Sequence, residues 1–224
     1  MSKLDRGEKG EAKVNALLEG IAEPRYVFHD VTLVNATSEM THQIDHILVH
    51  PHGVFVIETK NYYGQILYDE ASGEWSKVVR GQKTRTSNPL KQNKSHAITL
   101  RKALKGSVHP IPVVVYARNN APYLPDENVI NAEDLSLFVE SYPYPRLLTL
   151  AEMAEIKRQI EEACVEVSKK EHLENIAILK QVRKETQAEM AYAIEQGLCP
   201  RCDHKIVVEG YEYHCPNCGY RFKL

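Results

Sequence analysis

The segment from Gln43 to Asn61, QIDHILVHPHGVFVIETKN, decides the fold of this chain. Two runs rich in β-forming residues, 44–50 and 54–60, flank a Pro-His-Gly turn, and this pattern predicts a β-hairpin. A loop of two residues at positions 51–52 fixes which residues of the two strands face each other. The hairpin is therefore expected to pair its strands in a single register.

In that register Asp45 lies opposite Glu58, and Gln43 lies opposite Lys60. Side chains alternate between the two faces of a strand, so Asp45, Glu58 and Lys60 share one face. Directly opposed residues have Cβ atoms roughly 4.5–5.5 Å apart, and like charges at that distance destabilise a hairpin. Two acids and an amine placed in this way indicate a metal site with a polarised water. A three-residue loop would instead pair Asp45 with Thr59 and break the cluster.

These groups suit the hydrolysis of phosphodiester bonds. Mg²⁺ is held by oxygen ligands and keeps several waters. Asp45 and Glu58 would supply carboxylate oxygens, and the backbone carbonyl of Thr59 could supply another. Lys60 could orient a metal-bound water, stabilise charge that develops on a phosphate, or, with a lowered pKa, accept the proton of the water. A bound ion lowers the pKa of its water and neutralises a phosphate oxygen, as this reaction requires.

A helix is predicted before the hairpin, beginning at Asp5 with Glu8 as its capping-box partner. Its apolar residues follow helical spacing, and extending their stripe back by one turn reaches Glu11. Two interpretations of Glu11 stay open. It is either a carboxylate on the core side that needs a partner, or a first-turn acid that the helix dipole stabilises. The apolar stripe consists of Val14, Leu17, Leu18 and Ile21.

A second helix is predicted after the hairpin. Asn88 is a favourable N-cap and Pro89 a favourable first residue for a helix that runs to Lys105. On this helix Gln92 and His96 are four residues apart and therefore neighbours on one face.

Other patterns complete the expected α/β arrangement. Residues 111–117 form an uninterrupted apolar run, which is typical of a strand buried on both faces. Thr149 and Glu152 form a capping box that opens another helix. Further strands are expected at 25–34 and 64–68, a polar loop at 80–87, and a helix from Ser168 to the residues before Gly197.

One stretch of the chain carries charge of a single sign. From Trp75 to His109 there are nine Lys or Arg residues and no Asp or Glu, although the formal net charge of the whole chain is −2. Such a patch beside a carboxylate site suggests a polyanionic substrate, and nucleic acid is the obvious one. The alternative is a solvated charged surface. The candidate nucleic-acid-binding residues are Lys77, Arg80, Lys83, Arg85, Lys91, Lys94 and Arg101.

The end of the chain carries two Cys-x-x-Cys pairs, Cys199 with Cys202 and Cys215 with Cys218. This spacing favours a structural Zn²⁺ held by four thiolates, because each pair can wrap two sulfurs around a tetrahedral ion. The segment between the pairs reads as two short strands around Gly210, which predicts a zinc ribbon. A site closed by four cysteines is not expected to be catalytic.

The 224 residues, with 43% hydrophobic and 26% charged side chains, are ordinary for a soluble globular protein. No apolar run approaches the roughly 18 residues of a membrane span, and the charged N-terminus does not read as a secretory signal, so we expect a cytoplasmic protein without membrane contact. The predicted division is a catalytic-type domain over 1–164, a helical spacer over 165–196 and the zinc ribbon over 197–224. The spacer is either a solvated connector or the contact of a homodimer.

Several short motifs occur in a fixed order over roughly residues 7–117. The motifs are Gly7-x-x-Gly10-Glu11, Gln43-Ile-Asp45-His46, Gly53-Val-Phe-Val-Ile-Glu58-Thr-Lys60-Asn61, Gly64, Trp75 and Asn88-Pro89-x-x-Gln92-Asn93. With these motifs the chain resembles the nuclease-related domain (NERD) family, a branch of the PD-(D/E)XK restriction-endonuclease-like superfamily.

The resemblance implies an α/β fold with a central mixed β-sheet flanked by helices. It also implies that Asp45, Glu58 and Lys60 are the catalytic set, that Glu11 contacts the metal region from the first helix, and that Gln92 approaches from the later helix. The leading hypothesis is a nuclease that acts on DNA with Mg²⁺ or Mn²⁺. The competing hypotheses are a nucleic-acid-binding module without hydrolysis and a protein-interaction adaptor, since fold alone does not fix function.

Overall fold

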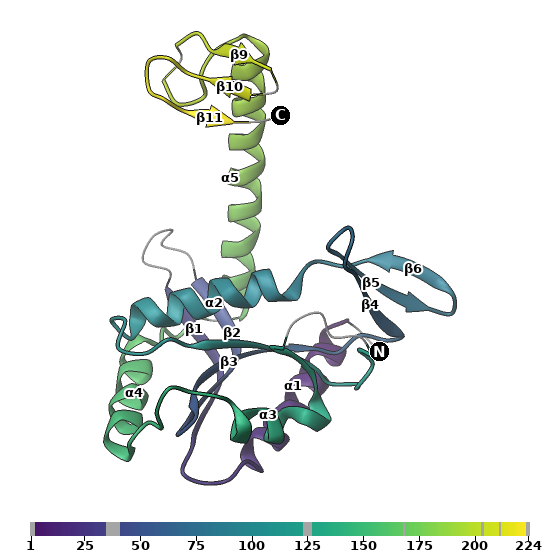
Figure 1. Ribbon diagram of the computed structural model, residues 1–224, viewed down its shortest axis with the longest axis vertical. Coiled ribbons are helices and arrows are strands. Elements are labelled where there is room, and N and C mark those ends of the chain that lie inside the picture. Colours follow the sequence, from purple (N-terminus) through teal and green to yellow (C-terminus); the bar gives the residue numbers. More distant parts are fainter. Residues whose placement is uncertain are drawn as a thin grey trace. The chain divides into compact units, whose positions relative to one another are not determined.

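Figure 1 shows the computed structural model of the chain. It describes residues 3–34, 41–122, 127–167, 169–202, 204–210 and 212–222. The chain divides into two compact units, Met1–Val167 and Ser168–Leu224, and each is considered by itself.

The first unit is built on a mixed sheet with the strand order β1-β2-β3-β7-β8. β1, β2 and β3 are antiparallel neighbours, whereas β7 and β8 run parallel to β3. This arrangement confirms the predicted α/β fold with a central mixed sheet. The strands are β1 (Tyr26–Val34), β2 (Thr41–His50), β3 (Gly53–Lys60), β7 (Ile111–Tyr116) and β8 (Val129–Asn131).

The hairpin formed by β2 and β3 has the predicted two-residue loop. Its pairs run from His50 with Gly53 to His46 with Ile57, so the register is the one expected. The ladder ends there within the described strands, so neither Asp45 with Glu58 nor Gln43 with Lys60 is among its pairs, as the prediction had them. Gln43 instead donates a side-chain hydrogen bond to Asp30 of β1, with 3.1 Å between Nε2 and Oδ1.

Helices cover both faces of the sheet (Figure 1): α1 and α3 lie on one face and α2 and α4 on the other. The helix α1 begins two residues before the predicted start at Asp5. The capping predictions for the other helices are confirmed, since Asn88 caps α2 and Thr149 forms a capping box with Glu152 at α4. The helices are α1 (Lys3–Glu19), α2 (Pro89–Ala103), α3 (Leu135–Ser141) and α4 (Leu150–Ala163), with a short 3₁₀ turn, η1, over Ala132–Asp134.

β3 is buried on both faces because its side chains enter two different cores. Phe55 and Ile57 pack with α1 and α3, whereas Val54 and Val56 pack with α2 and α4. All four side chains are fully buried, and burial of each contributes roughly 1.5–3 kcal/mol to folding. This burial holds the end of β3, and the charged residues that follow it, in a fixed position.

A small antiparallel sheet, β4-β5-β6, extends the first unit beyond the end of β3. Its strands are β4 (Gln65–Asp69), β5 (Glu74–Val79) and β6 (Gln82–Arg85). The loop predicted at 80–87 is therefore wrong in part, because residues 82–85 pair with β5. Trp75 and Ile66 anchor this sheet in a third apolar cluster. Gly64 enters it with φ +81°, and a Cβ there would lie 2.0 Å from the carbonyl oxygen of Val78.

The second unit consists of the helix α5 (Lys169–Glu195) and a three-stranded antiparallel sheet. The predicted helix start at Ser168 lies outside the described residues. The strands β9 (Val207–Glu209) and β10 (Glu212–His214) are the two expected around Gly210, and β11 (Arg221–Phe222) adds a third. None of the helices within the described ranges has the length and apolar character needed to cross a membrane.

Candidate functional site

The side chains of Asp45, Glu58 and Lys60 gather where the β2–β3 ladder ends. The backbone N–H of Thr59 donates to Oδ2 of Asp45 at 2.7 Å. This hydrogen bond lies just beyond the last strand pair, His46 with Ile57. Glu58 is only 4% exposed, and its Oε1 forms an ion pair with Nζ of Lys60. The structure therefore brings together the two acids and the lysine that the hairpin register predicts.

The electrostatics of this cluster resemble those of a cation site. Burial raises the pKa of Asp45 most, and the charge of Glu58 raises it further. The Thr59 N–H opposes this change, yet the pKa of Asp45 reaches about 8. Asp45 thus lies in a poorly hydrated space beside a second carboxylate, and both features disfavour its ionisation. A divalent cation would reverse this penalty, and Mg²⁺ uses one or two protein carboxylates together with waters and phosphate oxygens.

Lys60 is held as a cation in this cluster. Burial lowers the pKa of its ammonium group, but the charge of Glu58 and the hydrogen bond to it outweigh burial and leave the pKa raised. The ammonium also donates to Oε1 of Gln92 at 3.4 Å. The sequence-based alternative in which Lys60 has a lowered pKa concerns the ion-bound site and stays a prediction. Gln92 approaches the site from α2, as the resemblance implies.

The helix α2 is fixed over the site by a buried amide. Asn93 is fully buried, and its Nδ2 donates to the carbonyl oxygens of Val56 at 2.9 Å and of Val113 at 2.8 Å. These carbonyls belong to the neighbouring strands β3 and β7, so a single side chain ties α2 to both. The adjacent Gln92 is held near Lys60 as a result.

His96 is a site residue that sequence reasoning did not identify. Its Nδ1 lies 3.6 Å from Oε2 of Glu58, on the side of the carboxylate away from the Lys60 ion pair. Its ring centroid lies 5.5 Å from that of His42. The signal in the sequence was the four-residue spacing from Gln92, which places His96 on the same face but does not say what that face contacts.

Glu11 reaches the site from α1. It is half-buried, and its charge is among the causes that raise the pKa of Asp45. Because α1 begins at Lys3, Glu11 lies well beyond the first turn, and the interpretation as a dipole-stabilised first-turn acid is wrong.

The close approach of α1 to the end of β3 depends on Gly10 and Asn61. Asn61 follows β3, and its Nδ2 donates to the carbonyl oxygen of Arg6 at 2.7 Å. A Cβ on Gly10 would lie 2.6 Å from Cβ of Asn61, closer than side-chain carbons approach each other. A glycine at this position therefore lets α1 lie close to the end of β3, next to the acids.

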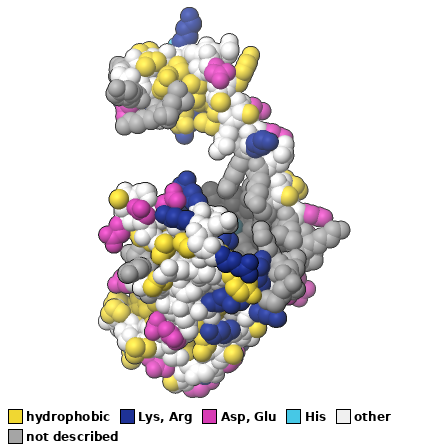
Figure 2. Space-filling view, turned by 90° about the vertical axis from the view of Figure 1, so that its right-hand side faces the viewer, with side chains coloured by type: hydrophobic (Ala, Val, Ile, Leu, Met, Phe, Trp, Pro, Cys, Tyr) yellow, Lys and Arg dark blue, Asp and Glu magenta, His cyan; other side chains and the backbone are white. Residues whose placement is uncertain are grey.

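The seven candidate nucleic-acid-binding residues fall into two groups on the first unit. Lys91, Lys94 and Arg101 lie on the exposed side of α2. The other four belong to β5, β6 and the turn between them, and Arg85 among them pairs with Glu74 at 3.6 Å. Figure 2 looks on to the side that lies at the right of Figure 1, and it shows Lys and Arg side chains gathered there beside hydrophobic ones. The group on β5, β6 and their turn consists of Lys77, Arg80, Lys83 and Arg85.

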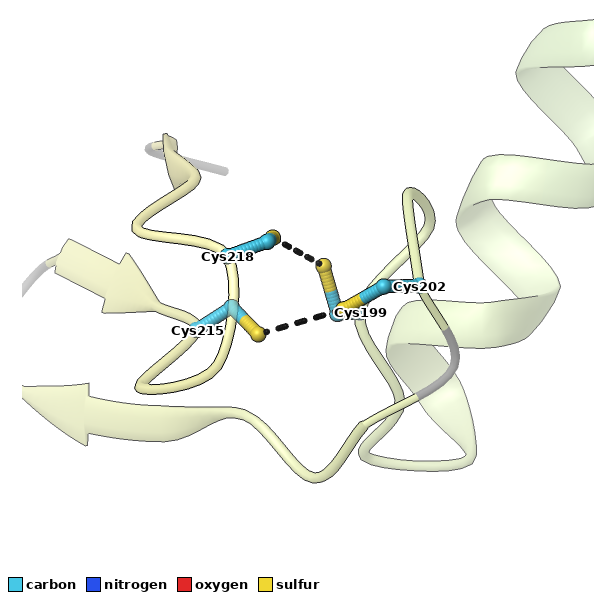
Figure 3. Close-up of side chains that lie close together, drawn as sticks. All are labelled: Cys199, Cys202, Cys215 and Cys218. Carbon is cyan, nitrogen blue, oxygen red and sulfur yellow. Dashed lines mark hydrogen bonds between the residues drawn. The ribbon is translucent and has the colours of Figure 1, made fainter.

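The four cysteines of the second unit form a separate cluster (Figure 3). All four Sγ atoms lie within 4.8 Å of one another, with 3.6 Å between Cys199 and Cys218 and 3.5 Å between Cys202 and Cys215. Zn–S bonds of about 2.3 Å give a tetrahedron with edges of about 3.8 Å, so the arrangement fits zinc. Asn217 also donates to Sγ of Cys202 at 3.6 Å, a contact of the kind that supports metal thiolates.

The fold and the site together define a class: α/β proteins with two acids and a lysine at the end of a central hairpin. The family model described as "Nuclease-related domain" (NERD) matches residues 6–117, and the chain belongs to this family. It is also 31% identical over 145 residues to an uncharacterized protein of Bacillus anthracis, an alignment that covers 61% of this chain and 67% of the relative. No solved structure matches the chain.

Proposed function

We propose that this protein is a metal-dependent nuclease that hydrolyses phosphodiester bonds of DNA. The observation that carries the proposal is the convergence of Asp45, Glu58 and Lys60 at the end of the β2–β3 ladder, in a chain of a nuclease-related family. The raised pKa of Asp45 supports it, because a bound cation would stabilise the negative charge that burial and Glu58 make unfavourable on this carboxyl group.

Each residue has a distinct role in this proposal. Asp45 and Glu58 hold the ion, Mg²⁺ or Mn²⁺, and Glu11 adds negative charge beside them. When bound, the ion lowers the pKa of a water and neutralises a phosphate oxygen. Lys60 orients the attacking water or stabilises charge on the phosphate by donating hydrogen bonds. Gln92 keeps the Lys60 ammonium in place.

The basic residues of β5, β6 and α2 supply affinity for the substrate in this proposal. Each phosphate contact that is lost should reduce the log–log salt slope of binding by roughly 0.9 on duplex DNA. Zinc at the four cysteines would hold the ribbon folded, and the ribbon acts as an auxiliary module for binding nucleic acid or for docking.

A cleavage assay tests the proposal. Single-stranded, double-stranded, branched and RNA substrates are incubated with Mg²⁺ or Mn²⁺ and resolved on a gel. We expect Asp45→Ala to abolish cleavage and Lys60→Ala to slow it by about 10²–10³-fold, the usual cost of removing one donor to a developing charge. Asp134→Ala, which removes an exposed acid of η1, is the matched control and should cleave normally.

Two results would contradict the nuclease proposal. The first is no cleavage of any substrate with either ion, and the second is normal cleavage by Asp45→Ala. Salt-dependent binding without cleavage would point to a nucleic-acid-binding module, whereas no affinity at low salt would point to a protein-interaction adaptor.

A further inference from the structure

A cavity of about 770 Å³ opens beside Lys60. Three elements of the first unit build its wall: the start of α1, the segment that follows β3, and β5 with the turn after it. Its volume lies in the range of about 300–1,000 Å³ that is typical of pockets enclosing a small molecule. The side chains that matter for its chemistry are Arg6, Lys60, Tyr62, Tyr63, Lys77 and Arg80.

The charge of this cavity is positive. Arg6, Lys77 and Arg80 line it together with Lys60, and no acidic residue is present among the described residues of its wall. Lys60 is engaged with Glu58, so the other three cations remain to attract an anion. A phosphate group is the ligand that such a set of Arg and Lys side chains recognises.

The cavity also contains two aromatic rings with cations against them. Nζ of Lys77 lies 5.6 Å from the ring centroid of Tyr62. The guanidinium groups of Arg118 and Arg6 lie 3.9 Å and 5.7 Å from that of Tyr63, which is 45% exposed. Each of these cations covers part of a ring, and the ring surface that they leave exposed is where a base can stack.

We propose that this cavity binds one unpaired nucleotide of the substrate strand, next to the phosphodiester that Asp45, Glu58 and Lys60 act on. The cations take its phosphate, and the base lies against Tyr62 or Tyr63. This inference rests on the proposed function and adds the substrate class: nucleic acid with a single-stranded segment, such as an overhang, gap or flap. A base inside a duplex has both faces covered by the neighbouring base pairs and cannot offer a face to a tyrosine.

The test is a comparison of binding to two substrates without added divalent ion, so that no cleavage occurs. A blunt duplex and the same duplex with a single-stranded overhang are titrated by fluorescence anisotropy. Loss of one stacking contact costs about 5- to 150-fold in affinity. We therefore expect Tyr62→Ala and Tyr63→Ala to weaken overhang binding by a factor in this range and to leave blunt-duplex binding unchanged.

Three controls separate stacking from folding. Tyr62→Phe and Tyr63→Phe keep the ring and should bind as the wild type does. Tyr192→Ala removes a tyrosine of α5 that is 66% exposed and should change nothing. In the unmodified protein, an overhang carrying 5-iodouracil should cross-link on irradiation to the peptide that contains residues 61–80, as mass spectrometry would show.

The outcomes distinguish this inference from the proposed function. Tyrosine-dependent binding of overhangs without cleavage in Mg²⁺ or Mn²⁺ would support the cavity and overturn the nuclease. Cleavage that requires Asp45 but shows equal affinity for blunt and overhang substrates, with no effect of the alanine variants and no cross-link to 61–80, would overturn the cavity. Absence of binding to both substrates would overturn the cavity, and Asp45-dependent cleavage in Mg²⁺ or Mn²⁺ would still support the nuclease.

Discussion

At the scale of single residues, the surroundings of Asp45 disfavour its negative charge. Its carboxyl group is buried beside Glu58, and the Thr59 N–H compensates only in part. Ionisable groups with strongly shifted pKa values occur at functional sites more often than elsewhere. The hairpin pattern was enough to predict this pair, because strand alternation and loop length fix a face. His96 was not predictable, since its contact with Glu58 depends on how α2 crosses the sheet.

The raised pKa of Asp45 predicts a pH-dependent stability. The folded state keeps a proton that the unfolded state releases between about pH 4 and pH 8, so the metal-free protein loses stability as the pH rises through this window. Asp45→Asn removes the ionisable group and should remove this loss. Urea unfolding of both proteins at pH 5 and pH 8, without added divalent ion, measures the difference.

Addition of Mg²⁺ or Mn²⁺ completes this experiment. Either ion should stabilise the wild-type protein at pH 8, by about 2.7 kcal/mol at a hundredfold excess over its dissociation constant. Asp45→Asn should respond weakly. An equal response of both proteins would contradict the assignment of Asp45 as a ligand.

At the scale of secondary-structure elements, two close contacts place helices on the hairpin: Gly10 of α1 against Asn61, and Asn93 of α2 against β3 and β7. Both residues belong to motifs visible in the sequence, but their contacts were not deducible from it. Long, regularly patterned elements were predicted well. β6 was missed because its residues are exposed and polar. β8 was missed because three residues are too few to show the alternation of apolar and polar side chains that marks a strand.

Replacement of Gly10 tests the α1 contact, with Gly7 as its matched control. A Cβ on Gly10 would collide with Asn61 at 2.6 Å, whereas a Cβ on Gly7 would meet only the flexible Glu11 carboxylate at 3.5 Å. We expect Gly10→Ala to cost about 1–3 kcal/mol of unfolding free energy and to reduce cleavage. Gly7→Ala should be neutral or stabilising by up to about 1 kcal/mol. Thermal melts measure both, and equal effects would disprove the close approach.

At the scale of the whole molecule, the chain consists of two compact units, and the nuclease-related match lies within the first. The second unit has few buried side chains besides Cys199 and Cys215 among its described residues. We expect metal at the four cysteines, rather than an apolar core, to hold the ribbon of this unit folded. The two Cys-x-x-Cys pairs were sufficient to predict the cysteine cluster, because ligand spacing is local in sequence.

Removal of zinc should consequently unfold the ribbon of the second unit and leave the first unit folded. A strong chelator is expected to make the four cysteines reactive toward a thiol reagent and to raise amide exchange across 197–222. In buffer to which no Mg²⁺ or Mn²⁺ has been added, the thermal transition of the first unit should stay unchanged, because that unit has its own cores. A lower melting temperature of the first unit after chelation would show that the two units depend on each other.

The two-residue turn at Pro51–His52 has a consequence for how this family tolerates change. Insertions at an exposed turn are ordinarily harmless. Here too a longer loop can absorb an extra residue at the turn, because Asp45 lies six positions before Pro51 and Glu58 six positions after His52. The same insertion within either strand, between one acid and the turn, would move that acid to the opposite face of the sheet. It would preserve every side chain of the site and still dismantle it. Related chains in which the two distances are unequal are therefore expected to have broken sites.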